Sequence, residues 1–183
     1  MTAGAAAAAS LLLPQSSFGA TQARRRRYAI IGTGHRATSM WGKDLREEYG
    51  DVVEFVGLCD SNHKRVQVAK GLIGAECPTF TSFDEMCDKA RPDLLMVATI
   101  DSTHVEYITK ALDRGIDVMT EKPMVTDEKQ CQAVLDAEKR NKRKIVVTFN
   151  YRYAPKQQKI KEILLSGEIG EATSVDFSWY LDV

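Results

Sequence analysis

Residues 28–37, Tyr28-Ala29-Ile30-Ile31-Gly32-Thr33-Gly34-His35-Arg36-Ala37, decide how the rest of the chain is interpreted. A short apolar run meets a glycine-rich turn, and the turn leads into residues that can begin a helix. In a dinucleotide site of the form Gly-x-Gly-x-x-Ala, Gly32 makes the turn, Gly34 leaves room for the phosphates and Ala37 lets the helix pack on the strand. Helix N–H groups and the helix dipole then hold the phosphate charge. A glycine-rich turn after any other strand would show the same pattern, so the rest of the chain has to confirm the dinucleotide site.

Composition fits a soluble globular protein and disfavours nucleic acid as the main partner. The chain has 183 residues, of which 44% are hydrophobic and 27% charged, with a formal net charge of 0. Because Arg24 to Arg27 contribute positive charge ahead of Tyr28, the remainder is mildly acidic. No C-x-x-C pair and no zinc-like spacing of histidines occurs, so we expect free thiols and no metal site at Cys59, Cys77, Cys87 and Cys131, with a disulfide between two of them as the alternative for an exported protein.

The N-terminal stretch differs from the rest and is excluded from the fold. Ala3 to Leu13 is rich in alanine and leucine and is too short for a stable membrane span. Small residues before Arg24 resemble a signal-peptide cleavage region, and the absence of a positive n-region suggests the tail of a twin-arginine leader. We therefore assign residues 1–26 to a leader and expect a periplasmic or exported protein. A disordered tail on a cytoplasmic protein is the alternative.

From Tyr28 onward, expected strands alternate with expected helices, which predicts an α/β fold with a doubly wound parallel sheet (Rossmann). Residues 27–150 form this dinucleotide-binding domain, and residues 151–183 form a linker helix with the first strand of an incomplete second domain. We expect strands, after the first, at 52–59, 79–80, 94–99, 117–120, 145–149 and 172–180. The expected helices are 38–49, 64–72, 83–90, 104–114, 127–141 and 156–165.

Polar residues follow the predicted strands, where a doubly wound sheet binds its ligand. Asp60 follows the second strand, and its carboxylate can accept both ribose hydroxyls of an adenosine and repel a 2′-phosphate. This favours NAD over NADP, although Lys64 and Arg65 soften the exclusion. A solvated aspartate after a strand is the alternative interpretation.

The later strand ends supply candidates for the nicotinamide end of a cofactor. Thr99, Ile100, Asp101 and His104 follow one strand, with a capping or packing role as the alternative for His104. Glu121-Lys122-Pro123 follows the next, where burial beside a cationic nicotinamide should lower the pKa of Lys122 and suit it to proton transfer. Asn150 could bond the nicotinamide ribose or carboxamide, and the residues that could bind a polyhydroxylated or anionic substrate are Tyr151, Arg152 and Tyr153. For this last segment, a domain connection with packed aromatics is the alternative.

Taken together, these motifs resemble the glucose-fructose oxidoreductase / inositol dehydrogenase / MocA (Gfo/Idh/MocA) family. The resemblance runs from Tyr28 to Val183, and Glu121-Lys122-Pro123 is its most specific element. It implies an NAD(P)-dependent oxidoreductase acting on a sugar, inositol or polyol. Glu121 and Lys122 would lie at the nicotinamide, with Lys122 as the catalytic residue. It also implies a second domain, which supplies a histidine and much of the sugar pocket, and a homo-oligomer for the full-length form.

Two other functions stay open at this point. An NAD-dependent glycosidase on the same scaffold would oxidise a sugar hydroxyl transiently and release the aglycone by elimination. A truncated, non-catalytic nucleotide-binding domain is the third reading, because half of the expected pocket is missing from the sequence. Ile100 also departs from the family, which often has Thr-Pro where this chain has Thr99-Ile100.

Overall fold

The computed structural model describes residues 24–180 and contains one six-stranded sheet. All of its strand pairs are parallel, and the strand order is β3-β2-β1-β4-β5-β6. This confirms the predicted doubly wound sheet. The strands are β1 (Arg26–Ile31), β2 (Val53–Cys59), β3 (Thr79–Phe80), β4 (Leu94–Val97), β5 (Asp117–Thr120) and β6 (Ile145–Val147).

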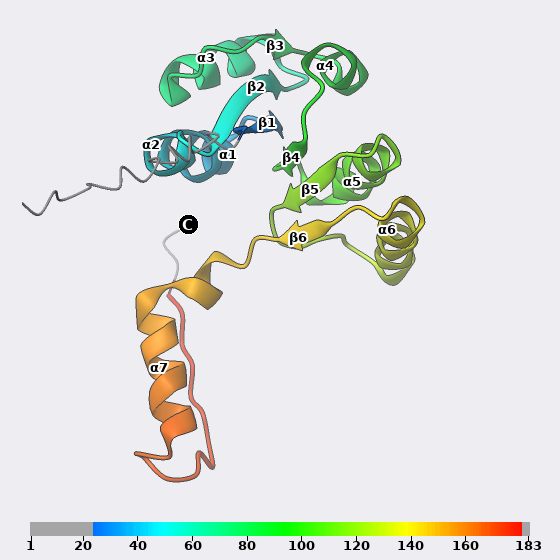
Figure 1. Cartoon of the computed structure of the whole chain (residues 1–183). Helices are drawn as coiled ribbons and strands as arrows, with labels where there is room; N and C mark the ends of the chain where they lie inside the picture. The colour runs from blue at the N-terminus through cyan, green and yellow to red at the C-terminus, as the bar shows by residue number, and fades with distance from the viewer. Residues whose placement is uncertain (1–23, 181–183) are drawn as a thin grey trace, which may run out of the picture.

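Helices cover both faces of the sheet (Figure 1). Tyr28 and Ile30 of β1 pack on one face with the helices after β1 and β2, whereas Ala29 and Ile31 point into the core shared with the helices after β3, β4 and β5. Such two-sided burial explains why the strands are wholly apolar runs. The helices are α1 (His35–Thr38), η1 (Ser39–Asp44), α2 (Leu45–Tyr49), α3 (His63–Ile73), α4 (Phe83–Ala90), η2 (Asp101–Thr103), α5 (His104–Asp113), α6 (Glu128–Asn141), η3 (Asn150–Tyr153) and α7 (Pro155–Ser166).

The first strand begins at Arg26, one residue inside the segment assigned to a leader. The arginines there fasten β1 to its neighbours: Arg26 pairs with Asp117, and Arg27 donates to the carbonyl oxygens of Ala90 (2.6 Å) and Arg91 (3.1 Å). The domain boundary therefore shifts toward the N-terminus. The predicted leader and its cleavage region, up to residue 23, lie outside the described residues.

The helical segment after the glycine turn starts earlier than predicted and changes its geometry. It begins at His35 and contains a π-helical stretch, η1, between α1 and α2. A Cβ on Gly42 would lie 2.5 Å from Cγ1 of Ile73, so glycine lets η1 pack directly on α3. No local pattern in the sequence predicts the π-helix, which contains Trp41, a hydrogen-bond donor to Glu121.

The predicted strand at 172–180 is wrong for the described part of the chain. Residues 170–180 have no regular secondary structure, and α7 buries none of its residues. Figure 1 shows α7 projecting away from the sheet, with the following segment running back along it. A single strand without a hydrogen-bonded neighbour is not stable in water, and the described residues offer none here. Among the described helices, none combines the length and apolar character needed to cross a membrane.

Candidate functional site at the carboxyl edge of the sheet

The glycine turn has the two properties that a phosphate-binding turn requires. Gly32 has φ +83°, and a Cβ there would lie 2.5 Å from the carbonyl oxygen of Ala98, so only glycine fits between β1 and the end of β4. A Cβ on Gly34 would meet nothing within 4 Å, so the space beside this residue is open. Ala37 is buried against Tyr28 and Leu58, as expected for close helix–strand packing. The turn thus leaves room for a ligand at the start of α1.

Asp60 at the end of β2 is buried and already bonded within the chain. Its Oδ2 atom accepts from the backbone N–H and the hydroxyl of Thr33, each over 2.9 Å, and its Oδ1 atom accepts from the N–H of Asn62. Burial acts to raise the pKa of Asp60, but these hydrogen bonds and Arg65 at 3.8 Å outweigh it, so the pKa is lowered. A carboxylate has about four acceptor positions, and three are in use. Asp60 therefore has room to accept one ribose hydroxyl rather than two.

A cavity of about 360 Å³ lies between Asp60, the glycine turn and the end of β4. Its size and position suit an adenosine. Sequence reasoning missed three of its lining side chains, because they lie just after β3 and in α4 and α5, away from the motifs. The only available signal was the place of Thr81 directly after β3. The missed residues are Thr81, Phe83 and Tyr107, whereas Ser61 and Thr103, which also line the cavity, adjoin the predicted site residues Asp60 and His104.

A second hollow of about 480 Å³ borders the same turn between η1 and α3. It shares Gly34 and Arg65 with the first cavity and carries two further basic side chains, His35 and Lys43. The side chain of His35 is exposed at the start of α1, as is that of Arg65 at the start of α3. The positive charges of Lys43 and Arg65 thus lie on the outer side of the glycine turn.

His104 does not face the candidate cofactor site, contrary to expectation. Its side chain is fully buried, with Nδ1 lying 2.8 Å from the carbonyl oxygen of Pro123 and Nε2 lying 3.2 Å from that of Thr99. The structure gives His104 the packing role that was the alternative, joining the loop after β4 to the loop after β5. The Thr99 hydroxyl accepts from Thr103, Ile100 is exposed and lines the cavity beside Asp60, and Asp101 is exposed without lining it.

Glu121 is likewise occupied by the protein itself. Its Oε1 atom accepts from Nε of Arg36 and from Nε1 of Trp41, both over 2.8 Å. Burial acts to raise the pKa of Glu121, but the bonds from Trp41 and Arg36 outweigh it, so the pKa is lowered and the group is anionic at neutral pH. The carboxylate thus links the end of β5 to α1 and η1, and its contact with a nicotinamide stays a prediction.

Lys122 is exposed rather than buried, but its backbone is held on both sides. Its N–H donates to Oε2 of Glu121 over 3.2 Å, and the peptide bond to Pro123 is cis. Because His104 contacts the Pro123 carbonyl, the segment 121–123 is fixed, whereas the Lys122 amine has no hydrogen bond or ion pair with any residue from 24 to 180. A primary amine at the end of β5 can donate hydrogen bonds to a substrate hydroxyl and exchange protons with it.

The segment after β6 places its polar residues at the same edge of the sheet. Asn150 is half-buried at the start of η3, and Tyr151, Arg152 and Tyr153 are exposed. The guanidinium of Arg152 lies 4.9 Å from the ring centre of Phe149, a cation–π contact. The Tyr151 ring packs edge-on against Trp179, with ring centres 5.2 Å apart, and all three side chains keep exposed surface.

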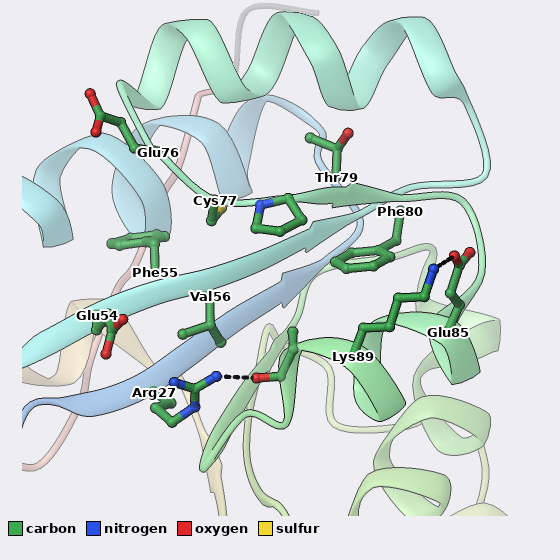
Figure 2. Close-up of a pocket in the computed structure, with 12 residues that line it drawn as sticks. Arg27, Glu54, Phe55, Val56, Glu76, Cys77, Thr79, Phe80, Glu85 and Lys89 are labelled. Atoms are coloured by element: carbon green, nitrogen blue, oxygen red, sulfur yellow. Dashed lines mark hydrogen bonds and ion pairs between the residues drawn. The ribbon is translucent and has the colours of Figure 1, made fainter.

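Features outside this edge do not add to the site. A cavity of about 490 Å³ lies among the amino-terminal parts of β1 and β2, β3 and α4, where Arg27 bonds the Ala90 carbonyl and Lys89 pairs with Glu85 (Figure 2). The cysteines are free, and at Cys77 and Cys87, away from this edge, burial raises the pKa of the thiol to about 11. Within residues 24–180, no group of histidine, cysteine or acidic side chains has an arrangement that could hold a metal ion.

Comparisons with known proteins agree with this arrangement. The GFO_IDH_MocA family model, described as an oxidoreductase family with an NAD-binding Rossmann fold, matches residues 26–149. YteT of Bacillus subtilis (strain 168), whose name assigns it to the oxidoreductases, is 46% identical over 157 residues, which are 84% of this chain and 37% of YteT. Inositol 2-dehydrogenase 3 of Saccharopolyspora erythraea is 32% identical over 148 residues, 79% of this chain and 42% of that protein.

A solved structure shares the fold. The WlbA dehydrogenase from Bordetella pertussis, in complex with NADH and UDP-GlcNAcA, superimposes with a TM-score of 0.73 at 24% identity. The match covers 80% of this chain and 44% of WlbA. The chain thus spans less than half the length of each of these three proteins.

Proposed function

The chain belongs to the Gfo/Idh/MocA family of oxidoreductases, and we propose that it binds NAD as the nucleotide-binding part of an enzyme that oxidises a hydroxyl of a sugar, an inositol or a related polyol. One observation carries the proposal: the open space at Gly34, the cavity beside Asp60 and the fixed segment around Lys122 lie after β1, β2 and β5, at one edge of the sheet. In a doubly wound sheet this edge is where a dinucleotide binds.

The residues present fit NAD. The pyrophosphate would lie in the open space at Gly34, against the first N–H groups of α1, and the adenosine would fill the cavity between Asp60 and Phe83. The acceptor position left on Asp60 suits one hydroxyl of an unphosphorylated ribose. A 2′-phosphate would meet the negative charge of this buried carboxylate, which supports NAD over NADP. Thr99, Ile100 and Asp101 would border the cofactor between its two ends.

Bound NAD would accept a hydride from the substrate carbon that carries the hydroxyl. The chain's own contribution to the chemistry is Lys122, whose free amine would hydrogen-bond that hydroxyl and take part in moving its proton. Asn150 would donate to the nicotinamide end of the cofactor. Tyr151, Arg152 and Tyr153, exposed at the same edge, would contact the substrate.

The two relatives named for a substrate or a reaction, the inositol dehydrogenase and the WlbA dehydrogenase, are redox enzymes. They support hydride transfer with net oxidation and give no support to the glycosidase. The test is NADH formation by the complete protein on a panel of sugars and inositols. We expect net NADH with at least one polyol and a loss of about 100-fold or more in turnover for Lys122→Ala. Tight NAD binding without net NADH on any compound would contradict the dehydrogenase.

A further inference from the structure

The carboxylate of Glu121 connects the helical segment after the glycine turn to the backbone of Lys122. Its Oε1 atom is held by Arg36 and Trp41, and its Oε2 atom accepts the N–H of Lys122. We propose that Arg36 and Trp41 are positioning residues, which hold Lys122 at the nicotinamide end of the site through Glu121. This inference rests on the proposed function, because it needs a bound dinucleotide for Lys122 to face.

The π-helical stretch explains how two residues five positions apart reach the same oxygen. Five residues span about 1.4 turns of an α-helix, which would turn Arg36 and Trp41 toward different sides. Arg36 lies in α1 and Trp41 in η1. Because the hydrogen bonds of a π-helix join residues five apart, the wider turn at η1 brings Trp41 toward the side of Arg36. Both side chains then point at the end of β5. A rare helix geometry thus coincides with the one place where this segment contacts Glu121.

Burial makes the contact difficult to remove without consequence. Glu121 is 6% exposed and carries a full negative charge, so each lost donor leaves a buried oxygen short of a partner. The carboxylate would then rotate toward other donors, and this rotation would disturb its hydrogen bond with the Lys122 N–H. Neither Trp41 nor Glu121 lines the cavity that suits adenosine. Loss of Trp41 is therefore expected to affect Lys122 more than the affinity for the dinucleotide.

A second anchor acts on the other side of the lysine. The buried ring of His104 contacts the carbonyl oxygen of Pro123 over 2.8 Å. Lys122 thus lies between two groups fixed from different elements, α1–η1 on one side and α5 on the other. Such support of the backbone, with a free side chain, is how a protein places a reactive group reproducibly.

The test follows the Lys122 amine itself, so that it does not depend on the identity of the substrate. Lysines of the chain are reductively methylated with a ¹³C label, and the Lys122 signal is assigned by its loss in Lys122→Arg. NADH is then added, with its binding followed in parallel by its fluorescence. We expect the Lys122 signal of the wild-type chain to shift on NADH binding. In Trp41→Phe we expect the same dissociation constant and loss of most of the shift.

Two further variants separate positioning from general stability. Glu121→Gln keeps an acceptor for Arg36 and Trp41, but its amide nitrogen cannot accept from the Lys122 N–H, so it should also lose the shift. Arg36→Met should reduce it, whereas Arg46→Met, an exposed arginine of the same helical segment, should leave it unchanged. If Trp41→Phe does not fold, Glu121→Gln carries the test.

Each outcome has one meaning. An undiminished Lys122 shift in both Trp41→Phe and Glu121→Gln overturns the inference. The inference is also overturned if the dissociation constant for NADH rises in Trp41→Phe in proportion to the lost shift, because Trp41 would then act on the cofactor. A wild-type chain that binds NADH without any shift at Lys122 also overturns it. Failure of the wild-type chain to bind NADH contradicts the proposed function instead.

Discussion

Thr33 donates two hydrogen bonds to a single oxygen of Asp60, one from its backbone N–H and one from its hydroxyl, each 2.9 Å long. The middle residue of the glycine turn is thereby tied to the end of β2. The bond fixes the turn and uses up acceptor capacity of the carboxylate. A residue expected to serve only the ribose therefore also shapes the phosphate-binding turn, and its substitution should affect both.

Asp60→Asn should lower both the stability of the fold and the preference for NADH over NADPH. The amide nitrogen must face a donor from Thr33 or Asn62, so we expect the free energy of unfolding to fall by about 1–3 kcal/mol. Loss of the negative charge should raise the dissociation constant for NADH and narrow the gap between NADH and NADPH. Urea unfolding and titrations with both dinucleotides measure these effects. Asp51→Asn, at an exposed turn, is the control, and an unchanged NADH/NADPH ratio in Asp60→Asn would count against the assignment.

Stability should depend on pH through Asp60 and Glu121. Both have a lowered pKa in the folded protein, so each stabilises the fold fully above its ordinary value, 3.8 for the aspartate and 4.5 for the glutamate. This stabilisation is lost as the pH falls through the lowered values. Urea midpoints measured from neutral pH down to about pH 3 should decline, and more steeply in the wild type than in the Asp60→Asn/Glu121→Gln double variant. Parallel profiles would show that other groups control acid unfolding.

Gly32→Ala should destabilise the chain by about 3 kcal/mol, from a positive φ and a Cβ only 2.5 Å from the Ala98 oxygen. Gly71→Ala is the matched control, because Gly71 lies inside α3 and its added Cβ would meet nothing within 4 Å. For Gly71→Ala we expect the free energy of unfolding to rise by about 0.5–1 kcal/mol. Thermal unfolding of both variants measures the contrast. Equal stability of the two would mean that β1 and β4 are not as close as described.

The sheet and the place of the site could be predicted from the sequence because their signals are local. Apolar runs gave strands, and parallel strands put Asp60, Lys122 and Asn150 at one edge whatever the details of packing. The ends of β4 and β6 were predicted too long, since Thr99 and Phe149 continue the β-rich pattern beyond the last ladder pair. The strand at 172–180 failed for a related reason: pairing depends on a partner that a local pattern does not reveal.

The roles of Glu121 and His104 could not be predicted, because their partners are distant in the sequence. Glu121 accepts from Trp41 and Arg36, which precede it by 80 and 85 positions. Trp41 reaches it from a π-helix that has no sequence signature. His104 contacts the Pro123 carbonyl, and a backbone acceptor leaves no mark on the sequence. Their position after strands predicts a contact with the cofactor. In the structure both side chains are buried and form hydrogen bonds within the protein.

The affinity of the chain for NADH before and after Gly34→Val tests the central claim most directly. Gly34 has ordinary backbone angles, and a Cβ there meets no protein atom within 4 Å, so the variant should fold, with only the small loss of stability expected for valine at the N-cap of α1. If the open space holds the pyrophosphate, the side chain must displace it, and the dissociation constant for NADH should rise at least about tenfold. A folded Gly34→Val chain that binds NADH as tightly as the wild type would contradict the account.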